Sequence, residues 1–274
     1  MPSVVAFSNG VITLGKAAEQ LMDKEPRNVT REFKRLMGQS FHTVEKELFP
    51  RLSSITEMGN DGIGILLDGQ TSSPEDLSSF ILDRINNIAR ELQVVPNFPD
   101  TIISVPAYFT DRQKDATIVA GKRAELNVIG VLEDPIAVAI TFFDSFPQLN
   151  VAGNIFLVFD LGGSTFDITL VGAGGDSHTV IDFDGDVNLG GSDFDELLLQ
   201  FCLDSATTQF GDEIRNNLQF VSSLRIQVQK AKLLFSTNQK FRINLQLENC
   251  VFKNFFLVKN SSICVMRNST VVWT

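Results

Sequence analysis

The segment that most constrains the fold of this chain is the run VFDLGGSTFDITLV, residues 158–171. Its apolar ends predict two buried strands, and its centre predicts a tight turn between them. Gly162 and Gly163 in that turn can adopt positive φ and present backbone N–H groups to an anion. The run by itself is equally compatible with an ordinary hairpin that carries incidental acids, so the rest of the chain has to decide.

Acidic residues stand on both sides of the turn, Asp160 before it and Asp167 after it. Carboxylates in these places could order the waters of a hard cation such as Mg²⁺, which keeps several waters when it binds phosphate. Ser164 and Thr165 add two hydroxyl groups. The run therefore predicts a turn that binds phosphate together with a hydrated metal ion.

Composition narrows the class of protein. The chain has 274 residues, 43% of them apolar, which is enough for one large or two ordinary globular domains. Its net charge of −10 argues against nucleic acid as a partner, because a phosphate backbone requires a basic surface. The sequence has no run of eighteen apolar residues and no secretory signal, so we expect no membrane association and a cytoplasmic location.

Cysteine and histidine spacing gives no metal signature. Cys202, Cys250 and Cys264 lack the CxxC pattern, and His42 and His178 lie far from them and from each other in the sequence. No zinc site is therefore expected.

Periodicity predicts alternating strands and helices. Three helix starts carry a capping residue with Asp or Gln three positions later, at Ser73, Thr110 and Ser192. Strands are expected at 2–7, 11–15, 101–106, 127–132 and 179–183, and helices at 73–92, 110–124, 136–144, 192–201 and 214–235. The turn-rich stretch FPQLNVAGN, residues 146–154, predicts a boundary between residues 1–150 and residues 151–274.

Several longer segments occur together in one order, and as a set they are highly specific. They resemble the seventy-kilodalton heat-shock chaperones, the DnaK-like class of the actin-like ATPase superfamily. The main matches are DTIISVPAYFTDRQKDATIVAGKRAELNVIGVLEDPIAVAITF (100–142), VFDLGGSTFDITLV (158–171) and GDVNLGGSDFD (185–195), with shorter ones at 2–7, 31–41 and 223–239. The resemblance covers the chain from Met1 to about Leu245.

This resemblance implies an α/β, actin-like (ribonuclease H-like) fold of two lobes, incomplete at both ends. Lobe I is expected at residues 1–150 and lobe II at residues 151–274, with a divergent tail from about residue 247. The implied cofactors are ATP or ADP and Mg²⁺, and the implied role is ATP-dependent protein folding in a stress response. Implied partners are J-domain co-chaperones, nucleotide-exchange factors and, where a substrate-binding domain exists elsewhere, unfolded clients.

The resemblance also assigns roles to individual residues. Lys34 matches the lysine that reaches the γ-phosphate and the attacking water, and Asp134 matches a carboxylate that arranges the water shell of the metal. Asp160 and Asp167 match the acids that hold Mg²⁺ through water, and Thr165 matches a residue of the catalytic turn. The implied nucleotide contacts are Gly162, Gly163, Ser164, Gly190, Gly191, Gln229, Lys232 and Ser236.

The chain departs from the family pattern in several places. Asp134 stands where the family has glutamate, and Glu133 beside it is a potential substitute. Ser164 replaces a third glycine, Gln229 an acid, Leu233 a cation and Lys114 an arginine. The first phosphate loop and the closing adenosine segment of the family have no counterpart in the sequence.

These departures leave three interpretations open. The first is an ATP-binding domain of a chaperone, for which hydrolysis stays undecided. The second is a catalytically impaired chaperone-like module that binds co-chaperones. The third is a gene fragment without activity.

Overall fold

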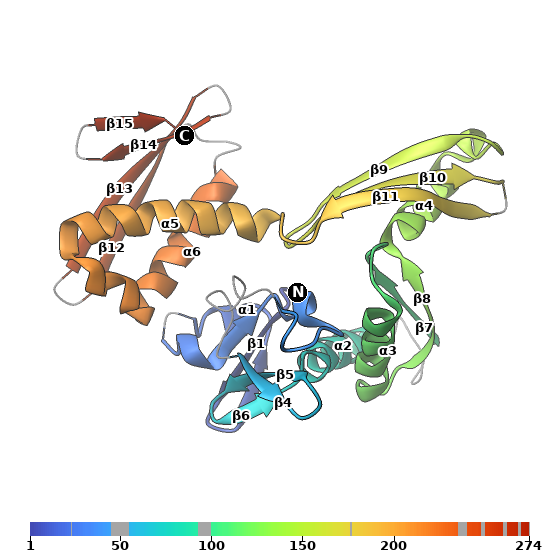
Figure 1. Ribbon diagram of the computed structural model, residues 1–274, viewed down its shortest axis with the longest axis horizontal. Coiled ribbons are helices and arrows are strands. Elements are labelled where there is room, and N and C mark those ends of the chain that lie inside the picture. Colours follow the sequence, from blue (N-terminus) through green and yellow to red (C-terminus); the bar gives the residue numbers. More distant parts are fainter. Residues whose placement is uncertain are drawn as a thin grey trace. The chain divides into compact units, whose positions relative to one another are not determined.

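The computed structural model describes residues 1–22, 24–44, 55–92, 100–175, 177–234, 240–247, 250–259, 262–267 and 270–273. Helices and strands are mixed along this chain, as the sequence predicts for an α/β protein (Figure 1). Its contacts divide it into two compact units, Met1–Leu21 with Arg27–Gly190 and Met22–Pro26 with Gly191–Thr274. The predicted lobe boundary at residue 150 lies within the first unit, and the lobe assignment remains a prediction.

Two small antiparallel sheets begin the first unit. Their strand orders are β2-β1-β3 and β4-β5-β6. The strands are β1 (Val4–Ser8), β2 (Val11–Leu14), β3 (Val29–Arg31), β4 (Ile55–Met58), β5 (Gly62–Leu67) and β6 (Gln70–Ser72). Helix α1 (Lys16–Glu19) and the 3₁₀ helix η1 (Pro26–Asn28) lie between β2 and β3 in sequence, and the 3₁₀ helix η2 (Phe33–Leu36) lies between β3 and β4. Apolar side chains of β1, η2, β5 and the following helix α2 (Pro74–Glu91) share one core.

A parallel strand pair follows, formed by β7 (Asp100–Val105) and β8 (Asn127–Glu133). The crossover between them is helix α3 (Asp111–Arg123), which packs against α2. Parallel neighbours require such a crossover because a tight turn cannot join them. Met37 packs with Ala116 and Ala120 of α3, so η2 and α3 are linked through the chain that follows η2.

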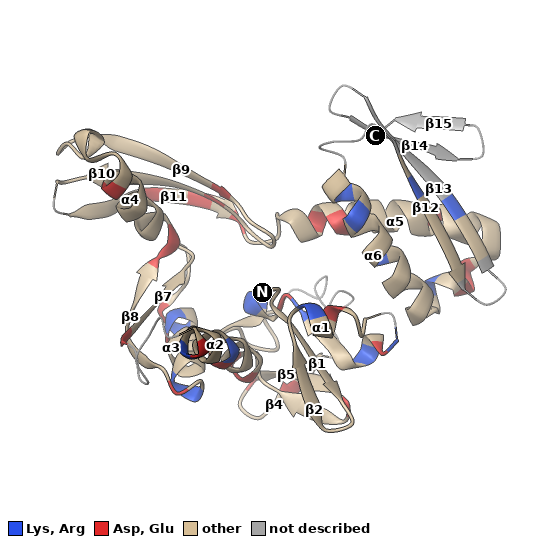
Figure 2. Ribbon diagram, turned by 180° about the vertical axis from the view of Figure 1, so that it is seen from behind, with Lys and Arg blue, Asp and Glu red and all other residues tan. Residues whose placement is uncertain are grey.

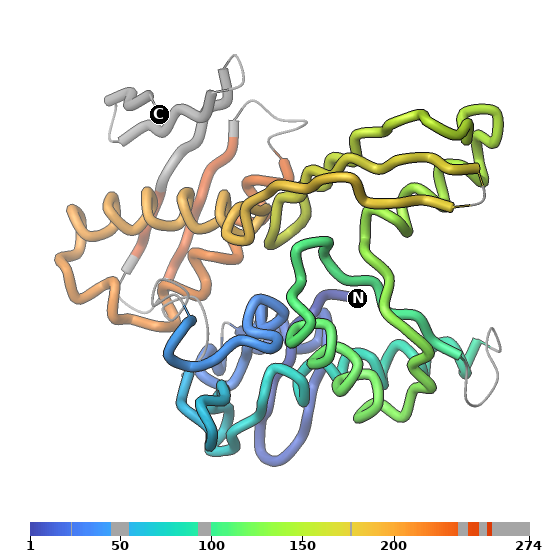
Figure 3. Tube along the Cα trace, turned by 45° about the vertical axis from the view of Figure 1, so that its right-hand side comes forward, coloured from blue at the N-terminus to red at the C-terminus, as the bar shows by residue number. Residues whose placement is uncertain are grey.

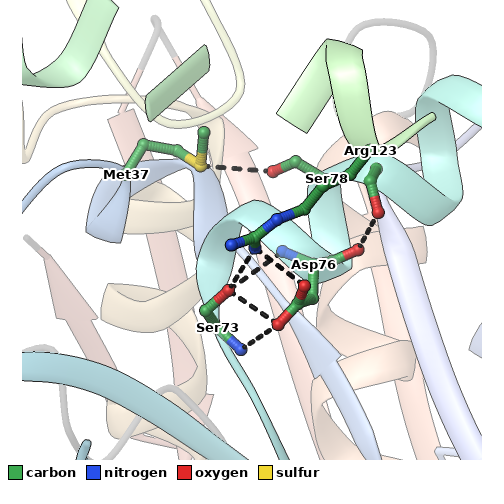
Figure 4. Close-up of polar contacts among 6 residues, drawn as sticks. Met37, Ser73, Asp76, Ser78 and Arg123 are labelled. Atoms are coloured by element: carbon green, nitrogen blue, oxygen red, sulfur yellow. Dashed lines mark hydrogen bonds and ion pairs between the residues drawn. The ribbon is translucent and has the colours of Figure 1, made fainter. Parts of the chain in front are cut away.

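Polar contacts fix the start of α2 (Figure 4). The Ser73 hydroxyl accepts the Asp76 amide at 3.1 Å, and the Asp76 carboxylate accepts the Ser73 amide at 3.0 Å. Arg123 at the end of α3 donates to Ser73 Oγ at 3.0 Å and to Asp76 Oδ1 at 2.7 Å. The predicted capping box is therefore confirmed, and it also joins two helices; the second predicted box, at Thr110, is confirmed as well.

The segment around the Gly-Gly turn forms a three-stranded antiparallel sheet of order β11-β10-β9. Its strands β9 (Ile155–Leu161), β10 (Phe166–Ala173) and β11 (His178–Asp186) run side by side (Figure 3). Helix α4 (Asp134–Ser145) covers one face, where Phe156 and Val158 pack against a core that includes Phe143.

The opposite face of this sheet is apolar on β9 and acidic on β11. Ile155, Leu157 and Phe159 are 61%, 60% and 64% exposed. The acidic residues of β11 are Asp182, Asp184 and Asp186, and acidic positions are red on the ribbon of Figure 2. In the described part of the chain β9 pairs only with β10, so the outer edge of β9 is open.

The second unit packs two long helices on a four-stranded antiparallel sheet. The helices are α5 (Gly191–Phe210) and α6 (Leu218–Leu234), with the 3₁₀ helix η5 (Asp212–Asn216) between them. The sheet has the order β12-β13-β14-β15, with β12 (Lys240–Leu247), β13 (Cys250–Lys259), β14 (Ser262–Arg267) and β15 (Thr270–Trp273). The sequence after residue 247 shows no clear period, yet the chain continues as regular strands there.

Both helices of this unit begin at other residues than the sequence predicts. Helix α5 begins at Gly191, so Ser192 lies inside the first turn rather than at the cap. Helix α6 begins at Leu218 rather than at residue 214, because Asp212–Asn216 form the 3₁₀ helix η5, and its buried residues include Phe220, Leu224 and Val228. Among the described helices, none is long and apolar enough to cross a membrane.

Replacing Ser73 with alanine removes the cap of α2 and one partner of Arg123. We expect the free energy of unfolding to fall by about 1 kcal/mol, the usual cost of losing a serine cap. Urea denaturation followed by circular dichroism measures this loss. As a matched control, Ser145→Ala removes an exposed hydroxyl that bonds only to the Thr141 carbonyl within α4 and should change the unfolding free energy by a few tenths of a kcal/mol at most. Equal stability of wild type and Ser73→Ala would contradict the assignment.

The open β9 edge and its apolar face should cause self-association, because unpaired strand edges and bare apolar surface favour pairing between chains. Sedimentation velocity should show oligomers for the wild type and a shift toward monomer for Leu157→Lys. Val11→Lys changes a residue that is 62% exposed on β2 and should leave the distribution unchanged. A monodisperse wild-type monomer would contradict this prediction.

Candidate functional site

The first unit contains a cavity of about 450 Å³, a volume typical of small-molecule sites. The regions that line it include the 3₁₀ helix η2, the start of α4 and the β9–β10 turn, which are far apart in sequence. The predicted residues that the structure brings together here are Lys34, Asp134, Asp160, Gly162, Gly163, Ser164, Thr165 and Asp167.

Three carboxylates face the cavity. Asp160 on β9 and Asp167 on β10 are direct cross-strand partners, so their side chains share one face of the sheet. Asp134 opens helix α4 and lines the same space. Like charges placed directly opposite each other destabilise a sheet. Such an arrangement is typical of a site that receives a cation.

The Asp167 carboxyl reflects this environment. Burial raises its pKa above the ordinary value, and the charges of Asp160 and Asp134 raise it further. The Thr165 hydroxyl, 3.3 Å from Asp167 Oδ2, and the ammonium of Lys34 oppose that rise. A bound cation would therefore favour the charged form of Asp167.

The 3₁₀ helix η2 contributes two cations to the cavity, Lys34 and Arg35. The Arg35 guanidinium donates to the backbone carbonyl of Ser164 and lies 3.7 Å from a Glu32 oxygen. Only 4% of the Arg35 side chain is exposed. Arg35 thus ties η2 to the β9–β10 turn, a role that the sequence did not reveal; its place beside Lys34 was the only signal.

The turn differs from the expectation in its backbone. Neither Gly162 nor Gly163 has φ in the left-handed region, and the Gly162 amide donates to the Thr165 carbonyl at 2.9 Å. Ser164 also lies outside that region, so serine fits in place of a glycine without backbone strain. No heavy atom lies within 4 Å of where a Gly163 Cβ would be, which leaves that side of the backbone open.

Gly190 is required by close packing. A Cβ at this position would lie 2.6 Å from the backbone nitrogen and carbonyl carbon of Ser164. Any side chain here would force the β9–β10 turn to move. Gly190 therefore contributes by backbone proximity to the turn, although it is not among the residues that line the cavity.

The remaining predicted contacts fall in the second unit. The Lys232 ammonium contacts Asp195 Oδ1 at 2.8 Å and the Gly191 carbonyl, so it holds the start of α5. Gln229 lies one turn earlier on α6, and Ser236 lies outside the described residues. Their contact with nucleotide remains a prediction.

Glu133 does not take the place of the shortened acid. Its carboxylate pairs with Lys114 at 2.9 Å, and only Asp134 lines the cavity. The exposed side-chain fractions of Lys114 and Glu133 are 25% and 34%, which marks a partly shielded contact between α3 and the end of β8.

A family model described as Hsp70 protein matches residues 1–260 of this chain. The chain belongs to the Hsp70 family. The match continues past Leu245, where the sequence resemblance was expected to end. Membership in the Hsp70 family implies an actin-like ATPase fold, and proteins of this family typically bind ATP and Mg²⁺.

Tyr108, the single tyrosine of the chain, also lines the cavity and was not predicted. Burial raises its pKa to about 12, the nearby Asp167 charge adds to the rise, and a hydrogen bond with Thr165 opposes it. Folding thus disfavours the phenolate, so the contribution of Tyr108 to the free energy of unfolding should be constant below the ordinary pKa of 10.0 and fall as the pH rises toward 12.

Ultraviolet titration of phenolate absorbance reads this group alone. We expect a pKa near 12 in the native protein, a value near 10.0 in urea, and a lower native value for Asp167→Asn. Native and urea-unfolded samples that titrate together would contradict the burial of Tyr108.

Proposed function

We propose that this chain binds ATP or ADP with Mg²⁺ in the cavity of the first unit and serves as the nucleotide-binding part of an Hsp70-type chaperone. The observation that carries the proposal is the placement of three aspartates opposite two cations around one glycine turn. The two-lobed, actin-like arrangement belongs to the same proposal.

The donor set fits Mg²⁺. This ion prefers oxygen ligands and retains several waters, and the cavity offers carboxylates on Asp134, Asp160 and Asp167. Asp160 and Asp167 would hold the hydrated ion, and its positive charge would offset the repulsion between the two carboxylates. The residues present therefore suit the cation that accompanies a nucleotide.

The same cavity suits phosphate. The open backbone of Gly163 and the hydroxyl group of Ser164 offer hydrogen-bond donors to phosphate oxygens, whereas the Thr165 hydroxyl is donated to Asp167. Lys34 supplies a mobile point charge, which suits a γ-phosphate. Arg35 is committed to Ser164, so it would stabilise the turn in its binding conformation.

Each residue would then have a defined part in hydrolysis. Bound Mg²⁺ would neutralise part of the negative charge of the phosphates. Asp134 would accept a hydrogen bond from the water shell, and Lys34 would orient the attacking water and stabilise charge on the γ-phosphate. Thr165 would remain hydrogen-bonded to Asp167 and keep it in place.

A second candidate is nucleotide binding without turnover, in a chaperone-like interaction module. The observation that favours it is the short side chain of Asp134 combined with the pairing of Glu133 to Lys114, which holds the longer carboxylate outside the cavity. Phosphoryl transfer depends mainly on positioning, so a displaced water would lower the rate strongly. J-domain proteins, exchange factors and a cytoplasmic setting are proposed for both candidates on the strength of the family alone.

Asp160→Ala should weaken binding of ATP in the presence of Mg²⁺ by roughly tenfold or more, because the ion loses one of two cross-strand acids. Isothermal titration calorimetry measures the affinity. Asp182→Asn is a matched control, since Asp182 lies in the same sheet but outside the cavity. This variant should bind ATP with the affinity of wild type.

Lys34→Ala separates the two candidates. An ATPase should lose turnover on this change, whereas a binding module shows no turnover before or after it. Folded wild-type protein that gives no heat with ATP and Mg²⁺ at any accessible concentration would overturn both.

A further inference from the structure

A second group of metal-ligating side chains lies in the first unit, apart from the cavity. His42, Glu57 and Asp61 each offer one ligand atom, and these three atoms lie within 4.8 Å of one another. None of the three lines the cavity of about 450 Å³. The sequence did not show the group because the acids come from a hairpin that only the fold brings to His42.

The backbone around this group is fixed by contacts on both sides. The Phe41 amide donates to the Asp61 carbonyl at 2.9 Å, and the Phe41 side chain packs against the core of the first two sheets. Asp61 has φ of 61° in the turn between β4 and β5. The loop that carries His42 and the turn that carries Asp61 are thereby held together independently of the imidazole.

The side chains of His42 and Asp61 are already paired by a hydrogen bond. An ion bound between them would replace this hydrogen bond and move the two ligand atoms slightly apart. His42 Nδ1 lies 2.6 Å from Asp61 Oδ1, and the His42 amide donates to the same oxygen at 3.0 Å. Ligand atoms of one tetrahedral ion with bonds of about 2.0–2.2 Å lie roughly 3.3 Å apart. Glu57 projects from β4 and is exposed, so its carboxylate can rotate into position without disturbing the core.

We propose that His42, Glu57 and Asp61 form a binding site for a divalent transition metal of the zinc type. One imidazole nitrogen and two carboxylates suit Zn²⁺, whereas Mg²⁺ prefers an all-oxygen octahedron. Three protein ligands leave one position for water. The ion would join the loop after η2 to the β4–β5 hairpin.

Zinc titration of the full chain tests this site. Excess Mg²⁺ is added so that sites formed by oxygen ligands alone are already occupied. We expect one Zn²⁺ per chain, roughly tenfold or more weaker binding for both His42→Gln and Asp61→Asn, and unchanged affinity for Asp68→Asn. Asp68 is a suitable control because it lies in the neighbouring β5–β6 turn with φ of 48° and outside the trio. Asp61→Asn keeps the volume of the side chain and guards against a folding defect in His42→Gln.

Two further readings complete the test. Co²⁺ should give visible bands of a nitrogen- and oxygen-ligated ion in wild type and in Asp68→Asn, and these bands should weaken in His42→Gln. Thermal unfolding should shift upward with Zn²⁺ in the same two proteins. Folded wild-type protein without saturable Zn²⁺ binding would overturn the proposal, and so would equal Zn²⁺ affinity in wild type and His42→Gln, which would place the ion at the cysteines or elsewhere.

Discussion

The cross-strand pairing of Asp160 with Asp167 is the constraint around which the first unit is arranged. Two carboxylates opposite each other on one face of a sheet repel, and that repulsion persists unless positive charge is near. The chain supplies Lys34 from η2, yet it also adds Asp134 from α4, so the acids outnumber the single mobile cation. A fold optimised only for stability would not gather these charges, and their grouping supports the proposed binding of a cation together with an anion.

The β9–β10 turn keeps its place through contacts that involve backbone more than side chains. Arg35 holds the Ser164 carbonyl from one side, and the bare backbone of Gly190 approaches Ser164 from the other. Serine can replace glycine at position 164 because its φ lies outside the left-handed region, whereas no side chain can replace the hydrogen of Gly190. The turn tolerates an outward Cβ, whereas the approaching segment has no room for one.

Local signals in the sequence were sufficient for most helices and strands of the first unit, whereas Lys34 and Asp134 were predicted only through the family resemblance and Tyr108 was not predicted. The capping boxes at Ser73 and Thr110 specify helix starts through contacts between residues three positions apart, so both partners can be recognised in the sequence. The contribution of Arg35 could not be read in this way, since its partner lies 129 positions away. The same reason applies to His42 and Asp61, whose proximity depends on how a hairpin folds back on a loop.

Apolar periodicity was a weaker guide where a strand is apolar on both faces. The run IFLVFDL of β9 predicts a strand buried on both sides, because one-sided strands alternate apolar with polar residues. Helix α4 covers Phe156 and Val158, but Leu157 and Phe159 remain exposed. The sequence of β9 thus predicts that the face opposite α4 is also covered by other apolar groups. That face excludes Asp160, which points to the cavity side with Val158, so a cover placed there would leave the aspartates accessible to a ligand.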